Sequence, residues 1–289
     1  CYRSLTAATS LGSPAELADP KGVAVGPDGR VFVADGRGSR ILVYANGQLV
    51  AQWGSQGSGP GQFNEPWGVA VGPDGSIYVA DTWNHRIQKL DREGRFVTSW
   101  GTFGDTQGRA TGDPDLFYGP RDVAVDADGN LWVTDTGNKR VCKFDANGRP
   151  LAQYGGAGAG DGQFLEPVGI AIDAEGNIYV ADTWNRRIQV FDRNFTYLRQ
   201  WPVAGWEGQS VANKPYLAVD GSGNVYATDP EAHRVIKFSA RGEVLAVWGR
   251  RGLDMASFEV PTGVEVDALG RVLVSDSGNQ RVLVFGSVQ

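Results

Sequence analysis

The chain has 289 residues, of which 41% are hydrophobic and 21% charged, with a net charge of −6. No apolar run approaches the roughly 18 residues of a membrane helix, and the acidic balance argues against nonspecific nucleic-acid binding, which depends on Lys and Arg. The 41 glycines and 9 tryptophans favour a turn-rich, all-β protein over a helical one.

The first residue leaves two interpretations open. Cys1 is either the lipid-carrying residue of a mature bacterial lipoprotein or an arbitrary starting point. Cys142 is the other cysteine, and two are too few to predict a disulfide framework or a zinc site. We therefore expect contact with a membrane only through a missing segment or a lipid on Cys1.

A unit of about 47 residues repeats from residue 20 onward. Each copy has an apolar stretch, a turn such as GPDG, a second stretch ending in Asp, a third strand beginning with Arg, and a fourth that usually ends in Trp or Tyr. Alternating β-branched residues and Gly-bearing turns identify hairpin-paired strands. The copies span roughly 20–54, 66–101, 120–155, 167–202, 214–249 and 261–286.

These units predict an all-β fold, a six-bladed β-propeller of four-stranded antiparallel blades in one domain over 1–289. The sixth unit stops after its third strand. Residues 7–12, AATSLG, align with FVTSWG at 96–101, which is the fourth strand of the second unit. We therefore expect an N-terminal strand at about 5–12 to complete the last blade and close the ring.

The residues that recur in every unit have a structural interpretation. Each Asp that ends a second strand is followed five positions later by Arg, which predicts an ion pair that orients the intervening turn. One further position, three residues before the residue that opens each unit, is expected to pack between blades: Leu17, Phe63, Phe117, Phe164, Val211 and Phe258.

The motifs Pro-x-Gly-Val-Ala-Val and Gly-x-Ile-Tyr-Val-Ala-Asp-Thr-x-Asn-x-Arg-Ile resemble the NHL repeat, over nearly the whole chain. Similar propellers occur as extracytoplasmic sensor domains of bacterial receptor kinases and as appendages of other membrane proteins. The resemblance implies an extracytoplasmic or cell-surface location, with the cytoplasm as the alternative. Related propellers that act as amidating lyases or lactonases hold a metal at the channel with His or carboxylates.

Ligand binding is expected where the units differ. In the family fold, the loops from fourth to next first strand and the second-to-third strand turns surround the mouth of the central channel. Trp, Tyr and Arg dominate binding hot spots. The variable charged and aromatic residues of that face are the candidate ligand-binding site: Lys21, Trp67, Trp83, Tyr118, Arg121, Asp122, Trp184 and Tyr216.

Two features of this face remain open. Trp83 and Trp184 either bind a ligand or pack over neighbouring blades. The loop between Trp100 and Pro120 is longer than its counterparts and contains Phe103. It either carries a binding specificity on the fixed scaffold or is a tolerated insertion.

Catalytic signals are sparse. His85 and His233 share a variable surface position, and no His set for a metal is evident, so we expect no catalytic residue, metal or cofactor. Glu265 stands out because it replaces an alanine of the other first strands. Alone it lacks the further oxygen ligands that a cation site needs.

The leading hypothesis is a noncatalytic binding module that recognises a protein, peptide or glycan through the mouth face. One alternative is a channel-centred, metal-dependent lyase or hydrolase. Another is single-stranded RNA binding through basic residues and stacking aromatics. The acidic balance makes nucleic acid the less favoured partner.

Overall fold

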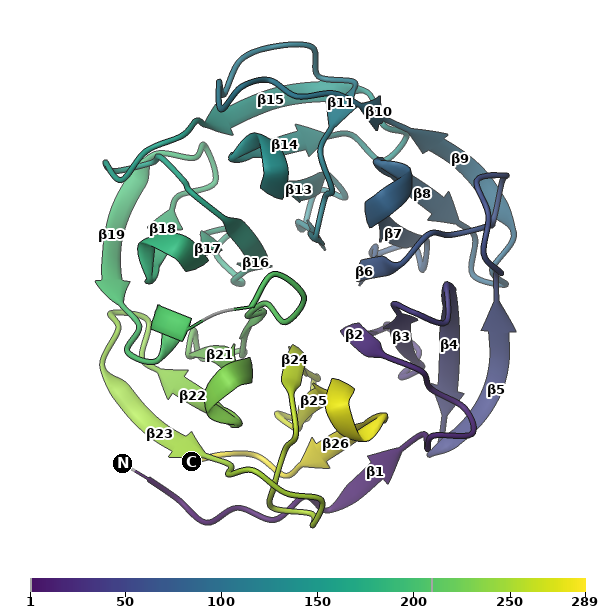
Figure 1. Ribbon diagram of the computed structural model, residues 1–289, viewed down its shortest axis with the longest axis vertical. Helices are drawn as coiled ribbons and strands as arrows, with labels where there is room; N and C mark the ends of the chain where they lie inside the picture. The colour runs from purple at the N-terminus through teal and green to yellow at the C-terminus, as the bar shows by residue number, and fades with distance from the viewer. Residues whose placement is uncertain (1, 209) are drawn as a thin grey trace.

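The computed structural model describes residues 2–208 and 210–289, which form a ring of six four-stranded sheets (Figure 1). The expected six-bladed propeller is therefore confirmed. Within these ranges, no helix is long and apolar enough to span a membrane. The two interpretations of Cys1 concern a residue outside them.

In each blade the first strand lies nearest the centre and the following strands lie progressively outward (Figure 1). Blades 1 and 2 contain β2 (Pro20–Val25), β3 (Val31–Asp35), β4 (Arg40–Ala45), β5 (Gln48–Trp53), β6 (Pro66–Val71), β7 (Ile77–Asp81), β8 (Arg86–Leu90) and β9 (Phe96–Trp100). Blades 3 and 4 contain β12 (Asp122–Val125), β13 (Leu131–Asp135), β14 (Arg140–Phe144), β15 (Pro150–Gly155), β16 (Pro167–Ile172), β17 (Ile178–Asp182), β18 (Arg187–Phe191) and β19 (Tyr197–Pro202). Blades 5 and 6 contain β20 (Leu217–Val219), β21 (Val225–Asp229), β22 (Arg234–Phe238), β23 (Val244–Trp248), β24 (Pro261–Val266), β25 (Val272–Asp276) and β26 (Arg281–Phe285).

The N-terminal strand closes the ring as expected. β1 (Thr9–Leu11) pairs antiparallel with β26 and becomes the outer strand of blade 6 (Figure 1). In this register Leu11 lies opposite Val282, and both side chains are buried in the same hydrophobic cluster. Pairing the two ends of the chain removes two sheet edges that would otherwise be open.

The first strands approach each other closely, which explains their recurrent glycine. A Cβ on Gly22 would lie 2.7 Å from the Trp67 carbonyl oxygen, and one on Gly68 would lie 2.8 Å from the Arg121 carbonyl oxygen. Blade 3 has Asp122 at the glycine position and blade 5 has Tyr216. Their inner strands are shorter, beginning at Asp122 and Leu217, so both side chains find room near the centre of the ring.

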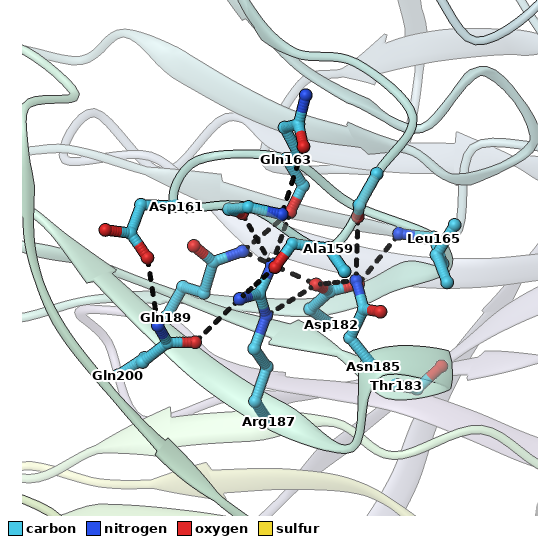
Figure 2. A network of polar contacts seen from close by, with 12 residues as sticks. Ala159, Asp161, Gln163, Leu165, Asp182, Thr183, Asn185, Arg187, Gln189 and Gln200 are labelled. Atoms are coloured by element: carbon cyan, nitrogen blue, oxygen red, sulfur yellow. Dashed lines mark hydrogen bonds and ion pairs between the residues drawn. The ribbon is translucent and has the colours of Figure 1, made fainter.

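The predicted Asp–Arg pairs are present in all six blades, with Nε–Oδ2 distances of 2.8 to 3.1 Å. Figure 2 shows the pair of blade 4, where Asp182 Oδ2 accepts hydrogen bonds from Arg187 Nε and Asn185 Nδ2. Asp182 Oδ1 accepts from the Leu165 amide, and Arg187 Nη2 donates to the Gln163 carbonyl. The pair thus ties the loop that enters a blade to the turn between its second and third strands.

One packing prediction is wrong. Val211 is 72% exposed, whereas the corresponding residues of the other blades are buried. In blade 5 the chain turns earlier, at η4 (Trp206–Gly208), and Trp206 is 2% exposed with its Nε1 donating to the Thr228 carbonyl. The larger Trp206 ring therefore fills the space that Val211 was expected to occupy.

Candidate functional site

Charged residues from five blades meet at the mouth of the channel, where the loops that enter the first strands come together. Each lies within one position of the residue that opens its unit, so the repeat itself brings them to one ring. We call this group the mouth cluster: Asp19, Lys21, Glu65, Arg121, Glu166 and Lys214.

Beneath the mouth cluster, two aromatic residues bridge opposite blades. The Tyr216 hydroxyl of blade 5 donates a hydrogen bond to the Trp67 carbonyl of blade 2 at 2.7 Å. Trp67 is also covered by Lys21 and Arg121, whose charged groups lie 4.8 and 4.5 Å from its ring centroid. Both aromatic side chains are therefore buried and leave little surface for a ligand.

Five of the eight residues of the predicted ligand-binding site are buried and do not form an open surface. Lys21, Trp67, Arg121 and Tyr216 are 3 to 5% exposed because they pack on one another across the ring. Asp122 lies deeper in the channel and is 6% exposed. The other three members form the rim, where Trp184 is 50% exposed, Tyr118 is 37% exposed and Trp83 is half-buried.

Arg121 is the most unusual charge of the mouth cluster. Its guanidinium lies over the rings of Trp67 and Trp83, with centroid distances of 4.5 and 4.6 Å. Nη1 donates to the Gly119 carbonyl at 3.0 Å, whereas Nε is buried without a hydrogen-bond partner. Among the described residues no carboxylate forms an ion pair with Arg121. Burying a cation without an ion-pair or hydrogen-bond partner is costly unless a ligand supplies the missing contacts.

Glu166 and Lys214 form an acid and base pair next to Arg121. Lys214 Nζ lies 3.7 Å from Glu166 Oε1 and 4.9 Å from the Trp184 ring centroid. Burial raises the pKa of Glu166 and lowers that of Lys214, and the attraction between the two groups only partly offsets this effect. Both shifts favour the neutral forms of the two groups.

The loop between β19 and β20 extends over the mouth toward blade 1 (Figure 1). Lys21 Nζ donates to the Ala212 carbonyl of this loop at 3.2 Å and also lies 3.3 Å from Asp19 Oδ1. Burial lowers the pKa of Lys21, and Asp19 opposes that shift. The loop that enters blade 5 is therefore held to blade 1 through Lys21 of the mouth cluster.

The long loop of blade 3 adds an aromatic rim beside blade 2. It pairs β10 (Thr102–Phe103) with β11 (Leu116–Phe117) in parallel. Phe103 packs on His85 at 4.8 Å and on Tyr118 at 5.2 Å between ring centroids. His85 Nδ1 accepts a hydrogen bond from the Gly119 amide, so this histidine supports the rim.

Below Tyr216, two carboxylates line the channel. Asp122 accepts hydrogen bonds from the amides of Val123 and Ile170, and burial raises its pKa well above the ordinary value. Glu265 lies where the channel meets a cavity of about 1110 Å³ on the opposite face of the ring. Burial raises the pKa of Glu265 to about 7. This cavity is thus at the end of the channel away from the predicted site.

The described side chains do not fit a metal site. No three His, Cys, Asp or Glu residues in these ranges converge on a point where an ion would bind. His233 lies on blade 5, away from His85, and its Nδ1 is 2.6 Å from the Glu259 carbonyl. The metal-dependent form of the enzyme hypothesis therefore has no donor set here.

Four members of the mouth cluster escaped the sequence-based prediction: Asp19, Glu65, Glu166 and Lys214. A signal for them exists in the repeat. Asp19, Glu65 and Glu166 immediately precede the proline that opens a unit, and Lys214 replaces that proline in blade 5. Comparing the opening position and the residue before it across units would have identified all four.

Solved structures with this fold include several enzymes. A streptogramin B lyase has a TM-score of 0.64 at 14% identity, covering 96% of each chain. A gluconolactonase from Xanthomonas campestris has a TM-score of 0.68 at 15% identity, covering 98% of this chain and 92% of that one. Virginiamycin B lyase from Staphylococcus aureus has a TM-score of 0.65 at 12% identity, covering 97% and 99%. No curated protein matches the chain by sequence.

These neighbours contradict the expectation of a noncatalytic, non-enzymatic module, because propellers that match the chain over nearly its whole length are lyases and a gluconolactonase. Identities of 12 to 15% establish the shared fold alone. The reaction must therefore be inferred from the residues of this chain.

The NHL repeat family model matches five stretches, residues 17–44, 63–90, 117–144, 164–191 and 258–285. Each stretch runs from the buried packing residue before a blade to within one residue of the end of its third strand. Blade 5 is the unmatched unit, in agreement with its exposed Val211 and its Tyr216 in place of glycine. The chain belongs to the NHL-repeat β-propeller family.

Proposed function

We propose that the protein is an enzyme of the lyase or hydrolase class whose active site is the mouth cluster. The observation that carries this proposal is the buried pair of Glu166 and Lys214, 3.7 Å apart, beside an Arg121 guanidinium without an ion-pair partner among the described residues. The lyases and the gluconolactonase among solved propellers of this fold support the same reaction classes.

The three side chains supply complementary functions. Glu166 acts as general base and takes a proton either from the carbon next to a carbonyl group, in an elimination, or from a water molecule, in a hydrolysis. Arg121 stabilises the negative charge that develops on the carbonyl oxygen. Lys214 returns a proton to the leaving group. No step is assigned to a metal ion, because the described residues provide no donor set for one.

The pH dependence follows from the two pKa shifts. The base must be ionised, so kcat/KM rises with pH through the raised pKa of Glu166. The acid must be protonated, so kcat/KM falls again through the lowered pKa of Lys214. We expect a bell-shaped profile that is narrower than the ordinary pKa values of Glu and Lys would produce.

Turnover of a panel of lactones, esters and streptogramin B compounds, with and without a free carboxylate, tests this proposal. Glu166→Gln should lower kcat by about 100-fold or more on any substrate turned over by the wild type. Glu231→Gln, an exposed change in blade 5, is the matched control and should leave kcat unchanged. Full activity of folded Glu166→Gln would refute the assignment.

A second candidate places the acid–base group at Glu265. It is favoured by the cavity of about 1110 Å³ that reaches this carboxyl from the opposite face. The same assay separates the two sites. Loss of activity in Glu265→Gln, together with full activity in Glu166→Gln, would move the active site to the opposite end of the channel.

A further inference from the structure

We propose that Arg121 binds a carboxylate group of the substrate, so the mouth cluster selects organic monocarboxylates. This inference deepens the proposed function, and its catalytic meaning rests on that function. Binding of a carboxylate to Arg121 is nevertheless measurable without turnover, which makes the two claims separable.

The guanidinium of Arg121 is ordered but unsatisfied. It is held between the Trp67 and Trp83 rings and is 5% exposed, yet its hydrogen bonding is limited to the contact from Nη1 to the Gly119 carbonyl. Nε has no partner. Arg140, which is also buried, has a hydrogen-bond partner for each guanidinium nitrogen. It donates from Nε to Asp135, from Nη1 to Gln153 and from Nη2 to two backbone carbonyls.

Lys214 provides a second donor to the same place. Its side chain is fully buried, and Nζ has no hydrogen-bond partner, because Glu166 Oε1 at 3.7 Å is beyond hydrogen-bonding distance. The charges of Lys214 and Arg121 interact and oppose each other in the ligand-free protein. A substrate carboxylate placed between them would satisfy both donors and remove that repulsion. In the proposed elimination, the oxygen on which Arg121 stabilises negative charge then belongs to this carboxylate, and Lys214 keeps a proton for the leaving group.

The surrounding charges favour a monoanion over a dianion. Glu65 and Glu166 already lie close enough to interact with Arg121, so a phosphate dianion would be repelled more strongly than a carboxylate. The guanidinium packed on Trp67 and Trp83 also suits a planar group, since a carboxylate can accept two parallel hydrogen bonds from it. Both arguments identify the same ligand chemistry.

The test is a titration of the full chain, followed by intrinsic Trp fluorescence at constant ionic strength. The probes are acetate, propanoate and butanoate, with inorganic phosphate as the competing anion. We expect carboxylate binding to change the fluorescence saturably, because Arg121 contacts Trp67 and Trp83 and Lys214 contacts Trp184. Arg121→Gln should weaken this binding by about 10- to 100-fold. Arg37→Gln is the control, since Arg37 is 73% exposed and lies 3.8 Å from Asp19.

Arg121→Lys keeps the charge and guards against a folding defect in Arg121→Gln. A lysine cannot make the two-point contact, so binding should still weaken by about tenfold. Three outcomes would overturn the inference: no saturable signal with any carboxylate, equal affinity in folded Arg121 variants, or tighter binding of phosphate than of every carboxylate. If carboxylates bind through Arg121 but Glu166→Gln keeps full turnover, the proposed function is rejected and this inference stands. If Glu166→Gln loses turnover but no carboxylate binds, this inference is rejected and the proposed function stands.

Discussion

Blades 4 and 5 are neighbours built on the same repeat, but they differ in how many hydrogen bonds the repeat aspartate accepts. In blade 4, Asp182 accepts hydrogen bonds from two backbone amides and from the side chains of Arg187, Asn185 and Gln189. In blade 5, Asp229 keeps its Arg234 contact at 2.9 Å, while its Oδ1 is buried without a hydrogen-bond partner.

The unpaired Oδ1 corresponds to the atom that, in blade 4, accepts hydrogen bonds from the Leu165 and Glu166 amides of the entering loop. At Oδ2 two side-chain donors are lost as well, because Ala232 replaces the asparagine of the turn and Ile236 replaces the glutamine of the third strand. The loop that enters blade 5 also leaves the usual path, with Trp206 buried and Val211 exposed. The same loop brings Lys214 and Tyr216 to the mouth of the channel. Blade 5 thus departs from the repeat where it contributes to the candidate site.

The largest expected contrast concerns the packing residue before each blade. Phe164→Ala in blade 4 should lower the free energy of unfolding by about 3–5 kcal/mol, because it empties a fully buried site. Val211→Ala, the aligned change in blade 5, should cost less than about 0.5 kcal/mol, whereas Trp206→Ala should cost about as much as Phe164→Ala. Urea denaturation measures all three, and a large effect at Val211 would show that the loop packs differently.

A smaller contrast is expected at the aspartates that recur in every blade. Asp182→Asn weakens several charge-assisted hydrogen bonds at once and should cost about 2–3 kcal/mol. Asp229→Asn should cost about 1 kcal/mol or less, because its network is already incomplete. Equal losses in urea denaturation would mean that the missing donors of blade 5 are replaced by contacts such as ordered water.

Restoring the blade 4 pattern should stabilise blade 5. In Ala232→Asn the new amide can donate to Asp229, as Asn185 Nδ2 does to Asp182 at 2.7 Å, for a gain of about 0.5–1 kcal/mol. Asn185→Ala provides the reciprocal change and should lose a similar amount. A destabilised Ala232→Asn would indicate that Pro230 holds the turn in a shape that the asparagine cannot use.

The smallest expected effect is a pH dependence of the free energy of unfolding. Burial raises the pKa of Asp229, so the folded protein keeps a proton that the unfolded chain has already released. The free energy of unfolding therefore falls as pH rises from the ordinary value of 3.8 to the raised pKa. Asp229→Asn removes this fall, and its stability relative to wild type should increase with pH across that window. A pH-independent difference would contradict the shift.

Most of the fold could be predicted from the sequence, because a repeat presents each structural constraint several times. Every predicted Asp–Arg pair is formed, and the strand over Thr9–Leu11 completes blade 6. The prediction that Val211 packs between blades was wrong. It came from aligning blade 5 with the other units, and blade 5 is the unit that departs from the repeat. Predictions from a repeat are therefore weakest at its irregular members.

The candidate site was predicted less well. The mouth face was identified from residues that vary between blades, yet Trp67, Arg121 and Tyr216 proved to be buried. Their burial depends on contacts between blades on opposite sides of the ring, such as the bond from Tyr216 to the Trp67 carbonyl. The partners in that bond are 149 residues apart, and no local pattern encodes their meeting.

The sequence by itself determined the number of blades, the order of their strands, the closing strand and the recurrent ion pairs, because each depends on contacts within one unit or between units in register. The tertiary structure alone decided which charges at the mouth are paired. Asp19 pairs with Lys21 and Glu166 with Lys214, whereas Arg121 has no carboxylate partner among the described residues. That outcome depends on the radius and closure of the whole ring, which place side chains from five blades around one axis.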